Sequence, residues 1–338
     1  MNATEPTQAQ VVHREMRALV TGAAGFVGRW LTDAMRREGI AVTAMAVAGT
    51  DRRSEHDRLD PALVAPIDWH YGDLRDDEYV RRTVSAARPD FVVHLAAISH
   101  LPTAAADPAG AWDVNVTASA RLLHHLVGAR ASGECDPLVL VVGSAEQYGR
   151  HPHDALPLTE DAPQYPRTVY AATKAAQEIQ ALQVWRATGL RVVAARSFNH
   201  SGAGQEERFL LPALVARAVA MRAAAPDTPM IVGNTSPIRD FLHVSDVAAA
   251  YISLCKGGSP GESYNVASGV GRSVRMVAEQ VLARAGVVAP LSEDPALQRP
   301  VDVPALVGDS HKLQLTTGWR VTRSFDDIID DLLHAATR

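Results

Sequence analysis

The sequence Ala-Leu-Val-Thr-Gly-Ala-Ala-Gly-Phe-Val-Gly at residues 18–28 joins an apolar run to three glycines at the spacing G-x-x-G-x-x-G. An amphipathic segment, residues 26–38, follows, so the order predicts a strand, a tight turn and a helix. Gly22 permits the turn, Gly25 lets a pyrophosphate approach the backbone, and Gly28 lets the helix pack closely on the sheet. Because a helix N-terminus offers free N–H groups and a positive dipole end to phosphates, this turn is a candidate dinucleotide site.

The bulk composition is that of an ordinary soluble globular protein. The chain has 338 residues, 47% hydrophobic and 21% charged, enough for one large domain or two unequal ones. Its net charge of −5 lacks the basic excess typical of nucleic-acid-binding proteins. Cys135 and Cys255 form no metal-ligand pattern, and so few cysteines suit a reducing compartment. We therefore expect a cytoplasmic protein without a metal site or a nucleic-acid partner.

The N-terminal segment is polar and mixed in charge. It has no apolar stretch typical of a signal peptide, so we expect residues 1–15 to form a disordered tail. No run approaches the ~20 apolar residues that a membrane-spanning helix needs, so no membrane association is expected.

Short apolar runs alternate with helical patterns through the first half of the chain. The predicted strands are residues 18–21, 40–47, 69–72, 91–95, 138–142 and 191–195. The predicted helices are residues 26–38, 76–87, 112–131 and 170–188. Repeated strand–helix units predict an α/β fold with a doubly wound parallel sheet of the Rossmann type. Ligands bind such sheets at the carboxyl ends of the strands.

Beyond Asn199 the alternation weakens, and prolines and glycines become frequent. We predict a smaller α+β lobe that caps the sheet, with residues 241–255 returning to the main domain as a helix. The predicted division is a dinucleotide-binding domain of residues 16–198 and 241–256, and a substrate-binding lobe of residues 199–240 and 257–338.

The ends of two predicted strands carry residues that suit a cofactor pocket. Asp73 could accept a hydrogen bond from an adenine amine, or could equally cap the local turn. Ala96 and Ala97 are small, as a backbone passing under a cofactor requires.

The residues after strand 40–47 bear on the choice of nicotinamide cofactor. Sites that prefer NAD place an acid there to bind the ribose diol, whereas NADP needs a cation. No acid occupies the end of this strand, and Arg52 and Arg53 follow closely. The sequence therefore favours NADP(H), although Asp51 leaves NAD(H) possible.

A catalytic pattern follows strand 138–142. Ser144 lies at the strand end, and Tyr170 and Lys174, at positions i and i+4, share one face of the next helix. We expect the ammonium to favour the phenolate and to lower the pKa of Tyr170 from its usual value of about 10. Such a tyrosine can exchange a proton with an alcohol or ketone while a nicotinamide moves the hydride.

These residues resemble the extended short-chain dehydrogenase/reductase superfamily, in particular its nucleotide-sugar branch. The resemblance spans roughly residues 17–333 and includes the cofactor turn at 21–28, the strand signature at 88–97 and the structural Asn115. It implies that the catalytic residues are Ser144, Tyr170 and Lys174. The candidate cofactor contacts are Gly22, Gly25, Phe26, Val27, Gly28, Arg52, Asp73, Leu74, Leu95, Ala96, Ala97, Tyr170, Lys174 and Ser197.

Three segments of the second half, residues 196–205, 232–241 and 294–304, look like those of enzymes that act on GDP-linked 6-deoxyhexoses. The resemblance is nearest to reductases of GDP-4-keto-6-deoxy sugars, with GDP-mannose 4,6-dehydratases as confusable relatives. Guanidinium forks suit diphosphate oxygens. The candidate substrate contacts are Asn199, Arg239 and Arg299.

Glu146 and its neighbour separate these two activities. A 4,6-dehydratase must take a proton from C5 and help water leave C6, so it needs a base and a further acid or hydroxyl. Glu146 could be that base, but Ala145 can donate nothing, and dehydratases of this family generally carry Asp or Ser there. This departure favours simple reduction, in which Glu146 orients a sugar hydroxyl or satisfies the loop backbone.

The expected activity is NADPH-dependent reduction of the C4 keto group of a GDP-4-keto-6-deoxy sugar. A mannose-type hexose would give GDP-D-rhamnose, and a 6-deoxy-heptose analogue is also open. The alternatives are a 4-epimerase or a 4,6-dehydratase on the same scaffold, and a non-catalytic redox sensor. Such sensors commonly lack the Tyr–Lys pair, which this chain has.

Helices 112–131 and 170–188 could form an intermolecular four-helix bundle, as in relatives, and we predict a homodimer. The apolar residues of the first helix could instead pack on the sheet. They are Val116, Leu122, Leu123, Leu126 and Val127.

Overall fold

A seven-stranded sheet lies at the centre of the computed structural model, which describes residues 15–48, 67–223, 228–298 and 303–337. The strand order is β10-β6-β5-β4-β1-β2-β3, and every pair in this sheet is parallel. The strands are β1 (Arg17–Thr21), β2 (Ala41–Ala46), β3 (Asp68–Tyr71), β4 (Phe91–His94), β5 (Leu138–Val142), β6 (Arg191–Ser197) and β10 (Ser263–Val266). The predicted doubly wound α/β class is confirmed.

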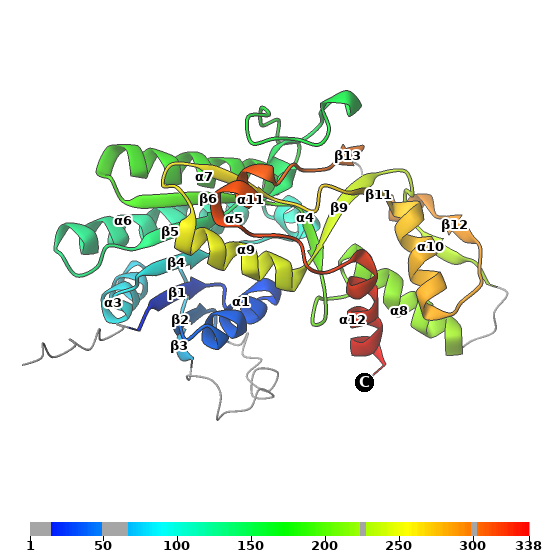
Figure 1. Cartoon of the computed structure of the whole chain (residues 1–338), viewed down its shortest axis with the longest axis horizontal. Helices are drawn as coiled ribbons and strands as arrows, with labels where there is room; N and C mark the ends of the chain where they lie inside the picture. The colour runs from blue at the N-terminus through cyan, green and yellow to red at the C-terminus, as the bar shows by residue number, and fades with distance from the viewer. Residues whose placement is uncertain (1–14, 49–66, 224–227, 299–302, 338) are drawn as a thin grey trace, which may run out of the picture.

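Helices cover both faces of this sheet (Figure 1). On one face lie α1 (Phe26–Arg37) and α9 (Val244–Gly257). On the other lie α3 (Asp77–Ala87), α6 (Ala118–Ala131) and α7 (Val169–Thr188). Successive strand residues point to opposite faces, so Leu140 joins the first core and its neighbour Val141 the second. The central strand β5 is therefore apolar throughout, as expected of a parallel strand buried on both faces.

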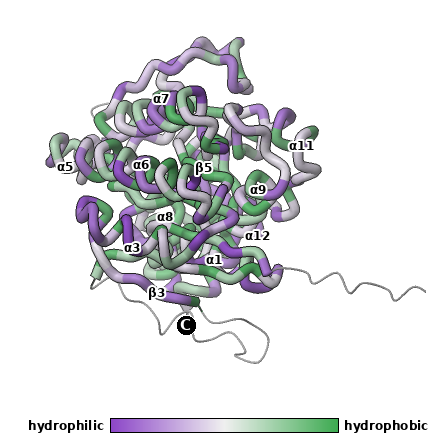
Figure 2. The backbone as a smooth tube through the Cα atoms, turned by 90° about the vertical axis from the view of Figure 1, so that its left-hand side faces the viewer, coloured by the Kyte–Doolittle hydropathy of each residue, from purple (hydrophilic) through white to green (hydrophobic). Residues whose placement is uncertain are grey.

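Figure 2 shows the hydrophobic strand segments around β5 inside the layer of helices. All of β5 is buried. Within the described part of the chain, no helix is both long and apolar enough to cross a membrane.

A smaller lobe lies beside the carboxyl ends of the sheet (Figure 1). Its strands are β7 (Asn199–Ser201), β8 (Met230–Val232), β9 (Ile238–His243), β11 (Gly271–Ser273), β12 (Leu291–Glu293) and β13 (Ala305–Leu306). Its helices α8 (Leu210–Ala223), α10 (Val274–Ala285) and α12 (Phe325–Ala336) share one apolar core. The remaining elements are α4 (Leu101–Ala106), α5 (Pro108–Trp112), α11 (His311–Thr317) and the short turns η2 (Asp113–Thr117), η3 (Ala145–Gln147), η4 (His153–Ala155) and η5 (Pro295–Leu297).

The structure corrects the predicted helix over residues 241–255. Phe241 belongs to β9, because its backbone pairs with Asn199 of β7, and α9 starts only at Val244. His243 caps that helix by accepting a hydrogen bond from the backbone N–H of Ser245. The predicted division also assigned residues from 257 onward to the smaller lobe, but β10 pairs with β6 in the main sheet.

The predicted helix over residues 112–131 is interrupted by the π-helical turn η2. Asn115 lies in this turn, and its side chain hydrogen-bonds both backbone groups of Ile98 as well as the hydroxyl of Thr173. The wider turn therefore lets one buried amide hold the loop after β4 against α7.

The apolar residues considered for a dimer face pack on the sheet. Leu122, Leu123 and Leu126 of α6 are buried in the core that contains Val139 and Val141 of β5. The homodimer stays a prediction, and these three leucines are not available to form it.

Asp246 joins the C-terminal segment to the first turn of α9. Its side chain is buried, and its carboxylate accepts hydrogen bonds from the backbone N–H groups of Thr322 and Arg323, at 3.1 and 2.9 Å. The Thr322 hydroxyl donates to the same carboxylate. One buried carboxylate therefore satisfies three donors of a segment far away in the sequence.

Asp246→Ala should lower the free energy of unfolding by about 1–3 kcal/mol, because it removes the buried acceptor of three partly buried hydrogen bonds. Denaturant unfolding measures the change. Asp330→Ala is the matched control, since Asp330 forms a surface ion pair with Arg284 and should matter little. Equal unfolding midpoints for the two variants would contradict the assigned role of Asp246.

Candidate functional site

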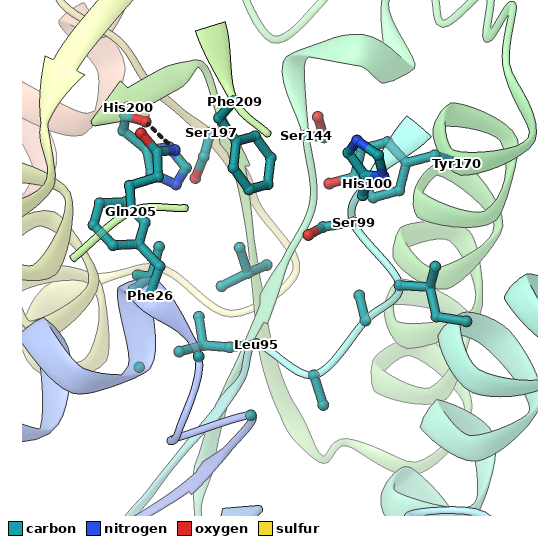
Figure 3. A pocket seen from close by; sticks show the side chains of 18 of the residues that line it. Phe26, Leu95, Ser99, His100, Ser144, Tyr170, Ser197, His200, Gln205 and Phe209 are labelled. Atoms are coloured by element: carbon teal, nitrogen blue, oxygen red, sulfur yellow. Dashed lines mark hydrogen bonds between the residues drawn. The ribbon is translucent and has the colours of Figure 1, made fainter. Parts of the chain in front are cut away.

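A cavity of about 1030 Å³ lies at the carboxyl ends of the sheet strands and against the smaller lobe. Its walls come from the turn between β1 and α1, the loops after β4 and β5, helix α7 and residues 197–211. Figure 3 shows Ser144, Tyr170 and His100 together on one side, opposite Phe26, His200 and Gln205. This volume lies at the upper end of the roughly 300–1,000 Å³ of ligand pockets, as a large ligand requires.

Nearly all the predicted cofactor contacts line this one cavity. They are Gly22, Gly25, Phe26, Val27, Gly28, Asp73, Leu74, Leu95, Ala96, Ala97, Tyr170, Lys174 and Ser197. The exception is Arg52, which lies outside the described residues together with its neighbours Asp51 and Arg53.

The glycine turn has the geometry that a dinucleotide requires. Gly22 has a φ of +69°, and a Cβ there would lie 2.9 Å from Cα of Ala96. A Cβ on Gly28 would lie 2.5 Å from the carbonyl oxygens of Gly22 and Ala23. Gly25 is the N-cap of α1 and offers no side chain to its first N–H groups, which are left for phosphate oxygens. The residues present therefore fit a nicotinamide dinucleotide.

Asp73 lines the cavity and also caps its own turn. Its carboxylate accepts from the backbone N–H of Arg75 at 2.8 Å and pairs with the Arg75 guanidinium at 2.7 Å. The hydrogen bond from Arg75 holds the pKa of Asp73 below its usual value. The turn-capping interpretation is confirmed, and an adenine contact stays a prediction.

Ser144, Tyr170 and Lys174 are brought to the same cavity from the end of β5 and from α7. The Ser144 hydroxyl accepts a hydrogen bond from the backbone N–H of Glu146 at 3.2 Å. Ser144 and Tyr170 lie on the same side of the cavity (Figure 3). The three side chains are thus placed for acid–base work on one oxygen atom.

The expected lowering of the Tyr170 pKa is wrong for this structure. Burial raises the pKa of Tyr170 to about 12, and the nearby Ser144 hydroxyl offsets only part of this rise. Burial also lowers the pKa of Lys174 to about 7, and its amine donates to Oε1 of Gln177 at 2.8 Å. The ammonium is therefore only partly charged at neutral pH, and Tyr170 keeps its proton, as a proton donor must.

A buried chain of hydrogen bonds connects Lys174 to the glycine turn. Gln177 donates to the Ser119 hydroxyl at 2.8 Å, and that hydroxyl hydrogen-bonds Nε2 of His94 at 2.7 Å. The other ring nitrogen of His94, Nδ1, hydrogen-bonds the Thr21 hydroxyl at 2.7 Å. Burial lowers the pKa of His94 to about 3, so this ring is neutral. The sequence analysis missed these positions, although His94 lies inside the strand signature and Gln177 follows Lys174 by one helical turn.

The predicted substrate contacts are only partly brought together. Asn199 is exposed and lines the cavity, whereas Arg239 is buried in β9 and does not. The Arg239 guanidinium donates to the carbonyl oxygens of Ile238 and Val303, at 2.9 and 2.7 Å. Arg299 lies outside the described residues. A diphosphate contact of either arginine stays a prediction.

His200 and Phe209 line the cavity without having been named as site residues, whereas their neighbour Phe26 was a predicted cofactor contact. His100 meets Phe209 edge-to-face, with ring centroids 6.0 Å apart, and Phe26 stacks on His200 at 6.3 Å. These contacts join segments far apart in the sequence, and no local pattern indicates which rings meet. Among the described residues, no group of three or more His, Cys, Asp or Glu side chains is placed to hold a metal ion.

A doubly wound sheet, a glycine turn after its first strand and a Ser–Tyr–Lys group at one cavity define an extended short-chain dehydrogenase/reductase. Comparison with known families agrees. The family model described as GDP-mannose 4,6 dehydratase matches residues 19–332, and the chain belongs to this family of nucleotide-sugar enzymes.

The relatives of this chain include different activities. GDP-6-deoxy-D-mannose reductase of Pseudomonas aeruginosa is 33% identical over 90% of this chain and 91% of the relative. UDP-glucose 4-epimerase of Streptomyces lividans is 28% identical over 93% and 94%. The solved structure of RMD from P. aeruginosa complexed with NADPH has a TM-score of 0.80 and 28% identity, and the match covers 95% of this chain and 98% of that one.

The buried Lys174 should make stability depend on pH. Its pKa is about 7 in the folded chain and about 10.4 when unfolded, so between these values the unfolded state binds more protons. The unfolding free energy of the wild type should therefore rise relative to Lys174→Met by about 2 kcal/mol from pH 7 to pH 9. Urea unfolding measures this difference, with Lys256→Met as the exposed-lysine control. A pH-independent difference for Lys174→Met would contradict the assignment.

Proposed function

We propose that this chain uses NADPH to reduce the C4 keto group of a GDP-4-keto-6-deoxy sugar. The observation that carries the proposal is Ala145, which lines the cavity between Ser144 and Glu146 and offers no second acid or hydroxyl. The reductase from P. aeruginosa, at 33% identity, supports the same activity. The proposed substrate is a mannose-type hexose, which gives GDP-D-rhamnose, or a heptose analogue.

The proposed reaction needs one proton donor and one hydrogen-bond donor at the C4 oxygen. When bound, the reduced nicotinamide supplies the hydride to C4. Tyr170 transfers its phenolic proton to the C4 oxygen as negative charge develops there, and its high pKa keeps that proton in place until then. Lys174, at the next turn of α7, is proposed to bind the ribose beside the nicotinamide.

Ser144 is oriented to stabilise the developing charge. Its oxygen already accepts from the backbone N–H of Glu146, so its own proton is available for the C4 oxygen. A donor placed before the reaction costs no reorganisation when charge appears.

We propose NADPH as the preferred cofactor. The arginines that follow β2 in the sequence and the NADPH in the neighbouring solved structure support this choice. Other neighbours of this fold were solved in complex with NAD, for example the UDP-glucose 4-epimerase of Thermus thermophilus.

Glu146 supports a second candidate, GDP-mannose 4,6-dehydration. It lines the cavity directly beside Ser144 and Ala145, where a base for the C5 proton would be needed. The reductase proposal assigns Glu146 only to orienting a sugar hydroxyl.

The purified protein should oxidise NADPH rapidly with GDP-4-keto-6-deoxymannose, more slowly with NADH, and not with GDP-mannose alone. Nicotinamide absorbance gives the rates. Tyr170→Phe should lower kcat by about 10²–10⁴-fold while NADPH binding persists, because the proton donor is lost. Tyr165→Phe is the matched control, since Tyr165 is 57% exposed and lies away from the cavity. An intact NADPH signal with the keto sugar would overturn the reductase proposal, and isomerised sugar would indicate an epimerase.

Glu146→Gln distinguishes the two candidate reactions. A reductase should lose less than about tenfold in kcat, because Glu146 exchanges no proton, whereas loss of a general base costs about 10²–10⁴-fold. Product analysis by mass spectrometry follows both the keto sugar and GDP-mannose. A keto product from GDP-mannose in the wild type, lost in the variant, would favour the dehydratase.

A further inference from the structure

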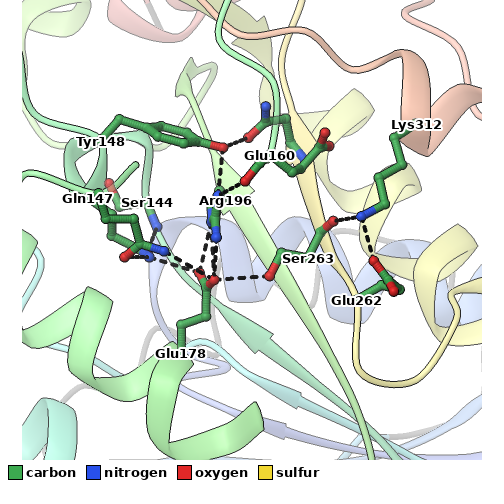
Figure 4. A network of polar contacts seen from close by, with 11 residues as sticks. Ser144, Gln147, Tyr148, Glu160, Glu178, Arg196, Glu262, Ser263 and Lys312 are labelled. Atoms are coloured by element: carbon green, nitrogen blue, oxygen red, sulfur yellow. Dashed lines mark hydrogen bonds and ion pairs between the residues drawn. The ribbon is translucent and has the colours of Figure 1, made fainter. Parts of the chain in front are cut away.

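A buried polar network lies directly behind Ser144 and takes no part in the proposed reaction (Figure 4). We call Gln147, Glu178 and Arg196 the support group. They are 0%, 2% and 7% exposed, and come from η3, α7 and β6. Arg196 and Glu178 form an ion pair at 2.6 Å. The support group therefore places a full charge pair inside the protein, next to the cavity wall.

Gln147 connects this ion pair to Ser144. Its Oε1 accepts from the backbone N–H of Ser144 at 2.7 Å, and its Nε2 donates to Glu178 at 2.8 Å. Its amide also packs against Gly143, where a Cβ would lie 2.3 Å from Oε1. Both the oxygen and the nitrogen of this amide are thus hydrogen-bonded, and the oxygen binds the backbone of Ser144 itself.

The charge of Glu178 dictates which way this amide points. Burial alone would raise the pKa of Glu178, but the hydrogen bonds and charge of Arg196 outweigh burial and hold that pKa below its usual value. An ionised carboxylate only accepts hydrogen bonds, so the NH₂ group of Gln147 must face it. The carbonyl oxygen of Gln147 then necessarily faces the N–H of Ser144.

The ion pair is itself held from several sides. Ser263 of β10 donates to Glu178 at 3.0 Å, and Arg196 donates to the Tyr148 hydroxyl at 2.9 Å and to the carbonyl oxygen of Glu160 at 2.8 Å. Figure 4 shows Arg196 between Tyr148 and Glu178. The carboxylate therefore has one position, and through Gln147 so does the Ser144 backbone.

Stability alone is a weak reason for such a group. Buried ion pairs carry a desolvation cost that often cancels their attraction, and apolar residues of similar volume can replace them without loss. Apolar replacements could not fix the orientation of the Gln147 amide, because only directional hydrogen bonds do so.

We propose that Gln147, oriented by the Glu178–Arg196 ion pair, is a positioning residue that sets where the Ser144 hydroxyl meets the C4 oxygen. The inference rests on the proposed function for its substrate, but it holds for any hydride transfer at C4 that uses Ser144. Small displacements of a catalytic group are costly, because its hydrogen bond to the reacting oxygen is strongly directional.

Gln147→Met keeps roughly the side-chain volume and removes the hydrogen bonds to Ser144, Glu178 and Gln164. We expect kcat to fall on the order of 10- to 100-fold with KM little changed, because ground-state binding does not need Ser144 to be aligned. Hydrogen–deuterium exchange of residues 143–149 should become faster, and NADPH binding should stay as in the wild type. Gln164→Met is the control, since Gln164 hydrogen-bonds both Glu178 and Nε2 of Gln147, at 3.3 Å each, and its loss leaves the bond from Gln147 to the Ser144 N–H in place.

A double-mutant cycle with Ser144→Ala separates positioning from general stability. Once the hydroxyl is gone, Gln147→Met should cost little further kcat. An equal loss of kcat in both backgrounds, or a loss confined to the melting temperature, would overturn the proposal. Gln147→Asn, which keeps the amide but shortens it, repeats the test if Gln147→Met does not fold, with the same expected direction.

If the proposed function is wrong, the wild type itself is inactive on the keto sugar, which is distinct from a failure of the Gln147 proposal. A wild type inactive on the keto sugar would overturn the reductase proposal alone. The same cycle would then be measured on GDP-mannose dehydration or on 4-epimerisation, whichever the wild type catalyses, with the same outcomes deciding the role of Gln147.

Discussion

The rest of the structure depends on the burial of polar side chains on one helix, α7, against an apolar sheet. Lys174, Gln177 and Glu178 follow one another along this helix and are each less than about 4% exposed. None can be buried without a partner, so Lys174 donates to Gln177 on the same helix, and Gln177 and Glu178 hydrogen-bond other elements. Gln177 binds α6 through Ser119, and Glu178 binds β6 through Arg196. These bonds fix the position of α7 against the sheet, and they thereby fix one wall of the cavity, which Tyr170 and Lys174 line.

The same burial sets the chemistry. Removing Tyr170 and Lys174 from water raises one pKa and lowers the other, so the tyrosine keeps its proton and the lysine carries less than a full charge. A protonated phenol beside Ser144 suits an enzyme that donates a proton to a ketone. The family membership and this geometry agree on hydride transfer at a nucleotide sugar.

Particular residues show how far sequence analysis reached. The glycine turn and the Ser144–Tyr170–Lys174 group were predicted, because each depends on a short spacing within one strand end or one helix. The direction of the Tyr170 pKa was predicted wrongly, because a spacing of one helical turn says nothing of how deeply the pair is buried. Arg239 matched a motif, yet its guanidinium is used on backbone carbonyl oxygens and does not line the cavity.

By itself the sequence determined the alternation of strands and helices, the glycine turn and the residues proposed as the catalytic group, since periodicity and local spacing depend only on neighbouring residues. Only the tertiary structure decided that Phe241 extends a strand, that Gln147 faces a charged Glu178, and that His100 meets Phe209 across the cavity. These facts depend on which distant segments share the same buried space, and no local pattern records that. The hydrogen-bond partner of a buried polar side chain depends on which segments pack around it, and that partner determines what the side chain does.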